Sequence, residues 1–339
     1  MLYVRLIAAR IPALLLVLLG VSAVTFVISH IVPADVARMV AGDYASDEAV
    51  AAIRAQLGLD QPLWRQYLIY VRDLLSGDFG TSIRTGQPVL KDLLTYFPAT
   101  VELALAALLL ALALGVPLGV AAAVSQGRWI DRAVRLFAAI SVSTPSFWLG
   151  LMLISVFYGR LDLFPAGGRM SEEFLDVDHV TGLHVVDAFL SGRAGAVADA
   201  LWRLALPAFS LALVAMGGFA RMIRSSMRET LQEDYVRVAR SLGLPERRVV
   251  LAHALPNALI PFVTMLGLSL ANLLTGAVVT EAVFMWPGIG SYILESTLAV
   301  DFPAIMGFTA LVSFIYVAAN LAVDLLYLRL DPRQRKVGA

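Results

Sequence analysis

The sequence predicts an all-α integral membrane protein with six transmembrane helices and both termini in the cytoplasm. Hydrophobic residues make up 59% of the 339 residues, the mean hydropathy is +0.78, and only 15% of residues are charged. Soluble domains carry about 25% charged residues. Six segments are apolar over the roughly 20 residues that a membrane-spanning helix needs. Basic residues are also distributed unevenly among the connections, which indicates an orientation.

The six apolar segments are expected at residues 9–31, 100–124, 131–159, 204–225, 258–281 and 304–328. The first follows Arg5 and Arg10, as a signal peptide would. Its apolar run is longer than the core of a signal peptide, so we expect an uncleaved membrane anchor.

The basic residues set the expected orientation. The link at 125–130, the loop at 226–257 and the C-terminal tail are basic, whereas the 282–303 loop has no Lys or Arg. Because cytoplasmic connections are enriched in Lys and Arg, these three basic segments are expected inside the cell. Segments 32–99, 160–203 and 282–303 are then expected outside.

Composition excludes several functional classes. The net charge of zero implies no general attraction to nucleic acid. The chain has no Cys, and its four His residues are scattered without metal-ligand spacing. No catalytic constellation and no phosphate-binding Gly-Lys-Ser/Thr loop is present. We therefore expect a non-enzymatic chain without a metal or a cofactor of its own.

The outer segment 32–99 is expected to form a small helical lobe. Helix signals run from Ser46 to a stop at Gly58, then over 62–75 and 88–94. The lobe could be a spacer between two spans, but more than 60 residues favour a docking surface. Segment 160–203 is acidic and on composition is a solvated loop. Pro145, in the middle of the third span, predicts a kink, which could serve packing alone.

Residues 229–256, here called the clip, differ from their apolar surroundings by being rich in charge. The spacing of the apolar residues predicts one stripe of an α-helix, formed by Leu231, Tyr235, Val238, Ala239 and Leu242. Gly243 follows the last of these, where a helix end favours a left-handed residue. Pro245 suits the first turn of a second helix, which we expect to run until Pro256. The clip could be an ordinary amphipathic surface helix or a structure that inserts into a cytoplasmic partner.

The clip resembles the cytoplasmic coupling loop of ABC-importer permeases. The general Glu-Ala-Ala pattern is only partly kept, because this chain has Arg237-Val238-Ala239 at that place. The dipeptide/oligopeptide/nickel branch matches better, through 234–237, 239–240, 243–244, 253–255 and 257–258. Further blocks in the family's order are 57–60, 77–82, 143–150, 165–169, 281–290, 301–303 and 331–333. The chain is most similar to the dipeptide permease B type.

The resemblance implies a membrane-spanning permease subunit of an ATP-driven importer for dipeptides or short oligopeptides. The implied partners are a homologous second permease, two cytoplasmic ATPases that bind ATP and Mg²⁺, and an extracytoplasmic peptide-binding protein. The residues implied to couple the permease to the ATPases are Glu233, Asp234, Tyr235, Arg237, Arg240, Gly243 and Arg247. The resemblance assigns no substrate-binding residue.

Two other functions are compatible with a multispan protein. An ion-coupled secondary transporter of a small polar solute usually has ionisable residues near the membrane midplane. Here Glu102 and Glu281 lie near outer ends of spans and Asp324 near an inner end. A membrane-embedded hydrolase would need a nucleophile with a base, or paired acids, and neither pattern is present.

Overall fold

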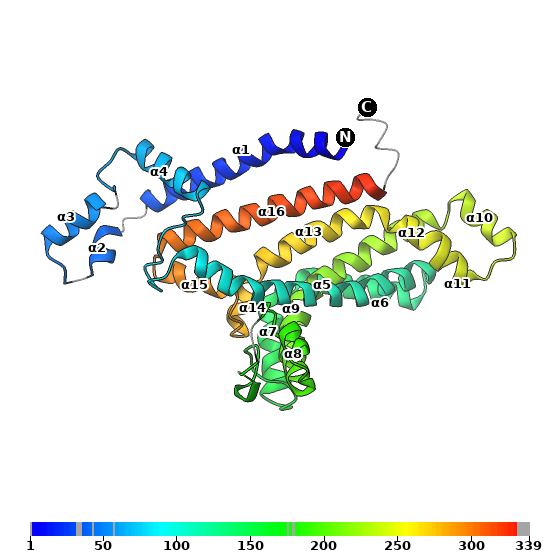
Figure 1. Ribbon diagram of the computed structural model, residues 1–339. Coiled ribbons are helices and arrows are strands. Elements are labelled where there is room, and N and C mark those ends of the chain that lie inside the picture. The colour runs from blue at the N-terminus through cyan, green and yellow to red at the C-terminus, as the bar shows by residue number, and fades with distance from the viewer. Residues whose placement is uncertain are drawn as a thin grey trace. The chain divides into compact units, whose positions relative to one another are not determined.

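A computed structural model describes residues 2–31, 36–42, 44–56, 58–174, 176–177 and 180–330. These residues are mainly helical, and the one β-type contact among them is the isolated bridge between Thr81 and Pro88 (Figure 1). The all-α class is therefore confirmed. The chain divides into two compact units, Met1–Phe97 with Ser291–Val317, and Pro98–Gly290 with Ala318–Ala339.

The first unit contains residues 32–97 of the predicted lobe. Its helices are α1 (Leu2–Ile31), α2 (Val36–Ala41), α3 (Asp47–Gln56), α4 (Leu63–Leu75), the start of α5 (Val89–Val124), most of α15 (Ile289–Leu298) and the first part of α16 (Phe302–Leu330). Helices α3 and α4 match the first two lobe helices expected from the sequence, and Gly58 between them has the left-handed φ of +67°. The third expected helix, 88–94, is not a separate element. Helix α5 continues past Leu94 to Val124 and contains Pro98 and Pro117 within its length.

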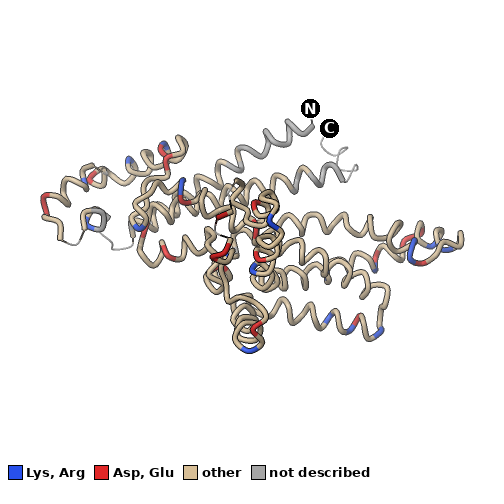
Figure 2. The backbone as a smooth tube through the Cα atoms, turned by 60° about the horizontal axis from the view of Figure 1, so that its bottom comes forward, with Lys and Arg blue, Asp and Glu red and all other residues tan. Residues whose placement is uncertain are grey.

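The second unit holds the remaining helices. They are the rest of α5, α6 (Trp129–Ser143), α7 (Ser146–Leu153), η1 (Ile154–Tyr158), η2 (Glu172–Phe174), α8 (His184–Leu190), α9 (Ala194–Thr230), α10 (Asp234–Ser241), α11 (Glu246–Arg248), η3 (Val249–Ala254), α12 (Leu255–Ala258), α13 (Ile260–Gly276) and α14 (Val278–Val283). Long stretches of these helices carry no charged residue (Figure 2).

Three helices are long and apolar enough to cross a membrane: α5, α9 and the Phe302–Ala322 part of α16. Two bent helix pairs raise the number of candidate spans to five if each pair is one span. In α1, the described apolar stretch is the shorter segment Leu15–Ser29. The described residues thus support a multispan membrane protein with three to five spans of this kind.

The third expected span, 131–159, is broken and not merely kinked. Helices α6 and α7 meet at an angle of 101°. Thr144, between them, has ψ of 121°, because the ring of Pro145 disfavours the helical conformation in the preceding residue. Pro145 also has no N–H to donate to the preceding turn.

The fifth expected span, 258–281, also differs from expectation. It begins after a 59° bend at Leu259, and α13 ends at Gly276 before the separate helix α14. The segment from 246 to 258 is helical through Pro256, so the clip does not end there as the sequence suggested. The π-helical turn η3 just before Pro256 replaces the ordinary hydrogen-bond register, in which a proline ring would clash.

Small residues allow α5 and α9 to pack closely in the core of the second unit. A Cβ added at Gly115 or Gly119 would lie 2.9 Å or 2.7 Å from backbone carbonyl oxygens of α9. Such Gly-x-x-x-Gly spacing lets helix backbones approach each other closely. Close packing matters in membranes, because hydrophobic burial contributes little to the association of helices there. Alanine and larger apolar residues, including Phe219 and Ile223, fill the surrounding core.

Segment 160–203 is an ordered structure and not a plain solvated loop. Asp187 is buried, and its carboxylate accepts hydrogen bonds from the Thr181 hydroxyl and from the N–H groups of Thr181 and Gly182. Arg169 is also buried and pairs with Glu102 on α5 at 2.5 Å. Composition could not reveal this, because both partners of each interaction are polar residues that usually face water.

Candidate functional site

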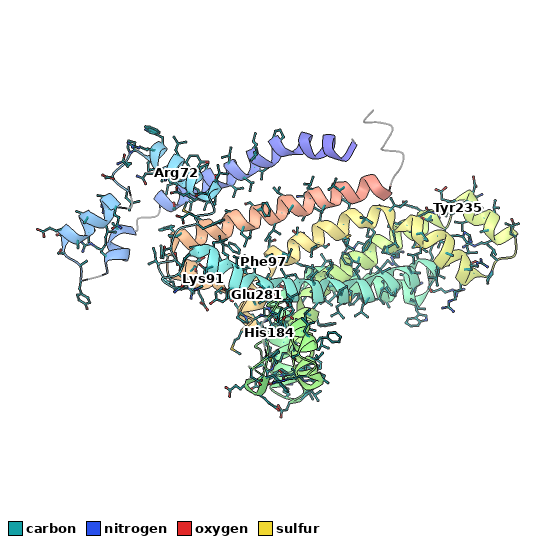
Figure 3. The ribbon with its side chains drawn as sticks, in the orientation of Figure 1. Arg72, Lys91, Phe97, His184, Tyr235 and Glu281 are labelled. Atoms are coloured by element: carbon teal, nitrogen blue, oxygen red, sulfur yellow. The ribbon has the colours of Figure 1, made fainter. Side chains whose placement is uncertain are left out.

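The clip forms a hairpin of short helices at one end of the second unit (Figures 1 and 3). Helix α10 ends at Ser241, and Gly243 then reverses the chain with φ of +77°. Pro245 directly precedes α11 and occupies its N-cap position, with φ of −62°. The turn expected at Gly243 and the second helix expected after it are both confirmed, although the second helix contains the π-helical turn η3.

Only part of the predicted apolar stripe is buried. Ala239 is buried in the core with Val236, whereas Tyr235, Val238 and Leu242 are 41%, 56% and 75% exposed. The predicted apolar stripe is therefore divided between the core and the outer surface. Val236 and Ala239 form the inward face of α10, which contacts η3. They share one hydrophobic core cluster with Val249 and Val250 of η3. The other apolar residues remain on the outer surface of the hairpin.

An ion pair joins the two arms of the hairpin. The Arg240 guanidinium donates from Nη2 to Glu246 Oε1 at 2.7 Å and from Nε to Oε2 at 3.1 Å. The hydrogen bond to Glu246 raises the pKa of Arg240 above its ordinary value. Arg240 also donates to the Leu231 carbonyl at 3.4 Å. The pair therefore ties α10 to both the preceding and the following segment.

The other predicted coupling residues lie on the surface of the same hairpin. Arg237 pairs with Asp234 at 3.0 Å and donates to the Gln232 carbonyl at 3.1 Å. Glu233 occupies the N-cap position of α10, with no side-chain capping bond, and is exposed. Arg247 is exposed on α11. The structure thus brings all seven predicted residues onto one hairpin.

Sequence reasoning did not assign a role to Asn257 or Glu246. The Asn257 side-chain amide donates to the Tyr235 hydroxyl at 2.8 Å and to the His253 carbonyl at 3.2 Å. Tyr235 (labelled in Figure 3) is thereby held from the second arm. The charge of Glu246, six residues after Arg240, was visible in the sequence, but only the turn geometry makes the two residues neighbours.

A second polar centre lies within the second unit, around Glu281 on α14 (Figure 3). This side chain is fully buried, and it accepts hydrogen bonds from the Thr100 hydroxyl at 2.6 Å and from the Gly290 N–H at 2.7 Å. The Ile289 N–H in turn donates to the Thr100 oxygen at 2.9 Å. Gly288 packs against the carboxylate so closely that an added Cβ would lie 2.4 Å from it. These bonds connect the turn after α14 to Thr100 on α5.

No cluster of His, Asp or Glu that could hold a metal ion occurs within the described ranges. The buried acids Glu102 and Glu281 are both engaged in structural contacts, Glu102 with Arg169 and Glu281 with Thr100.

Comparison with known proteins places the chain among transport components. A family model described as a binding-protein-dependent transport system inner membrane component matches residues 115–336, and the N-terminal model of such components matches residues 3–104. The chain is 55% identical to a probable D,D-dipeptide transport system permease protein of Escherichia coli strain K12, over 96% of each chain. It is 41% identical to a dipeptide transport system permease protein of Alkalihalophilus pseudofirmus, over 96% of this chain and 97% of that one. A dipeptide transport system permease protein of Escherichia coli strain K12 is 40% identical, over 94% of each chain.

Proposed function

The chain belongs to the family of binding-protein-dependent transport system inner membrane components, and from that premise we propose that it imports dipeptides or short oligopeptides. Its role is that of a permease in the inner membrane. The cargo proposal rests on the names of its relatives, which include D,D-dipeptide and dipeptide permeases. Competition for uptake between D,D- and L,L-dipeptides tests which stereochemistry the assembled importer accepts.

The proposed assembly pairs this chain with a homologous second permease, two cytoplasmic ATPases and an extracytoplasmic peptide-binding protein. The chain supplies no phosphate-binding loop, so ATP and Mg²⁺ are assigned to the ATPases. Closure of the ATPase pair on ATP would move the clip and shift the spans toward an outward-open state. Such a shift requires that ATP binds one of the two states more tightly than the other.

The observation that carries the coupling role is the exposed apolar surface of α10. Tyr235, Val238 and Leu242 lie on a hairpin whose charged residues are already paired in part with each other. An amphipathic helix that presents apolar residues outward is the element that inserts into a groove of a partner protein. We assign the polar rim of that contact to Glu233, Asp234, Arg237, Arg240 and Arg247. Gly243 forms the turn that sets the orientation of α10 relative to the second arm.

The proposed topology has six spans, with α1 and α16 included, the bent pair α6–α7 as one span and α13 as the core of the fifth span. Both termini, the 125–130 link and the clip are then cytoplasmic, and the 32–99 lobe is the docking surface for the binding protein. Single cysteines in this Cys-free chain should label from outside at Ser46, Ser171 and Ser291. Cysteines at Ser125 and Ser241 should label only after permeabilisation, and outside labelling at Ser241 would exclude the coupling role.

The energy source is tested in vesicles that contain the whole assembly. Peptide should accumulate with ATP present and the ion gradients collapsed. Uptake that persists without ATP and follows the proton gradient would favour the alternative, an ion-coupled transporter of a small polar solute. Against that alternative, both buried acids already have structural partners: Glu102 pairs with Arg169, and Glu281 accepts from Thr100 and a backbone N–H.

A further inference from the structure

Arginines gather where the first turns of α6 pack against the last turns of α9, within the second unit. Residues 128–135 and 221–229 contain six arginines and two carboxylates, which leaves an excess of four positive charges. The six are Arg128, Arg132 and Arg135 on or next to α6, and Arg221, Arg224 and Arg228 on α9. Helix α6 makes its most extensive contacts with α9, so these charges lie on two adjoining helices.

One carboxylate, that of Asp131, organises the centre of this group. Arg224 donates to it from Nε at 2.5 Å and from Nη2 at 3.1 Å, and the Gly127 N–H donates at 3.0 Å. Arg135 Nε lies 3.7 Å away. Asp131 is buried and already accepts these bonds, so it neutralises only one of the two arginine charges beside it.

The arginines border a pocket of about 210 Å³. Its lining consists of Val134, Arg135, Ala138, Ala220, Arg221 and Arg224. Arg221 donates to the Ala138 carbonyl at 3.3 Å and, in the described part of the chain, has no carboxylate within ion-pair distance. This volume is well above the roughly 10–15 Å³ that a single water needs, so the pocket has room for a phosphate group.

We propose that this pocket binds the phosphate of an anionic phospholipid headgroup, through Arg135, Arg221 and Arg224. Guanidinium groups present N–H donors in a fixed fork that matches phosphate oxygens, and three of them converge on one pocket here. Basic pockets between transmembrane helices are suited to anionic lipid headgroups. This site goes beyond the transport function, which does not require it.

The outer surface of α6 favours a lipid over an acidic protein as the occupant. Trp129, at the start of α6, is 75% exposed, and Leu136 and Ile140 further along are 64% and 55% exposed. Tryptophan is enriched at the level of lipid headgroups, and exposed aliphatic residues beyond it suit acyl chains. The pocket therefore lies between the charged end of α6 and its apolar outer surface. A lipid needs both, because its phosphate binds the charges and its acyl chains contact the apolar residues.

Basic residues near a span are also expected simply from the orientation rule, which counts charges in the connections. That rule requires no pocket and no convergence of two helices. Here Arg135 and Arg221 lie 86 positions apart in the sequence and border the same pocket. The convergence is what distinguishes a binding site from a topology signal.

The test is a titration of the purified full chain in neutral detergent micelles with phosphatidylglycerol, phosphatidylcholine or inorganic phosphate. We expect phosphatidylglycerol to bind at least tenfold more tightly than phosphatidylcholine. The double variant Arg135→Gln/Arg221→Gln should weaken phosphatidylglycerol binding by roughly tenfold or more, because it removes charge-assisted hydrogen bonds. Arg224 is left intact, since its loss would strand the buried Asp131.

The matched control is Arg193→Gln, which removes an exposed arginine that pairs with Asp176 in another part of the second unit. It should leave phosphatidylglycerol binding unchanged. The comparison of phosphatidylglycerol with phosphatidylcholine uses the wild-type chain alone, so it tests the proposal even if a variant fails to fold. Equal affinity for the two lipids, or inorganic phosphate that binds as tightly as phosphatidylglycerol, would overturn the assignment. Loss of lipid selectivity when the ATPases are bound would instead assign the arginines to a protein contact.

Discussion

Arg240 and Glu246 form a two-point ion pair across the turn at Gly243, with N–O distances of 2.7 Å and 3.1 Å. Both side chains are more than a third exposed, so the pair contributes little to global stability, about 0.2–1 kcal/mol at most. Its effect is local, because it fixes the angle between α10 and α11. The angle in turn decides where the exposed apolar residues of α10 point.

We expect Arg240→Glu and Glu246→Arg, each alone, to lower peptide-stimulated ATPase activity of the assembled importer several-fold. Melting temperature should change little, because the pair is exposed. The double charge swap should recover much of the activity, since it restores an ion pair across the turn. Failure of the swap, with both single variants impaired, would indicate that Arg240 contacts the partner directly.

Gly243→Val should uncouple transport without loss of membrane insertion. An added Cβ at Gly243 meets no heavy atom within 4 Å, so the cost of the substitution is in the backbone alone. A left-handed φ of +77° costs a residue with a Cβ roughly 1–2 kcal/mol, and a β-branched residue is stiffer still.

Expression and insertion of the Gly243 variants should stay near wild type, while uptake and peptide-stimulated ATPase activity fall together. Gly243→Ala should be milder than Gly243→Val, and Gly243→Asn milder again, because Asn tolerates the left-handed conformation. Full coupled uptake by Gly243→Val would argue for an ordinary surface helix at this place.

Leu242→Asp should weaken the association of the permease with its ATPases while the permease itself remains folded. Leu242 is exposed in the chain alone, so a charge there costs little until a partner covers it. Copurification of the ATPases with tagged permease measures the effect, and we expect recovery to fall several-fold. Val236→Asp is the contrasting variant, because Val236 is fully buried and the substitution should reduce folded protein. Unchanged copurification for Leu242→Asp would show that the exposed apolar residues of α10 do not take part in the contact with the ATPases.

Thr100→Val should destabilise the second unit through Glu281. The variant keeps the shape of the side chain but removes the hydroxyl that donates to the buried carboxylate and accepts from the Ile289 N–H. A buried polar group left without its partner costs about 1–3 kcal/mol, which should appear as a lower melting temperature in detergent. Thr100→Ser should retain most of the stability. Glu173→Gln, at an exposed acid, is the control and should melt as wild type does.

Periodicity in the sequence was sufficient to predict the all-α class, the main apolar segments and two lobe helices, because these depend on local composition and spacing. The turn at Gly243 was predictable for the same reason, since the need for a left-handed residue is a local property of the backbone. Family resemblance added the proposed coupling residues, which no pattern of charges alone would have singled out.

Tertiary structure decided which apolar residues are buried. Leu242 and Ala239 belong to one stripe by spacing, yet Ala239 is buried and Leu242 exposed, because only one side of α10 contacts η3. Contacts between segments distant in the sequence could not be predicted from it either. Thr100 lies 181 positions from Glu281, and Arg169 lies 67 positions from Glu102. Local sequence determines where a helix begins and ends. The partner of a buried polar group depends on which segments the whole fold brings within hydrogen-bond distance.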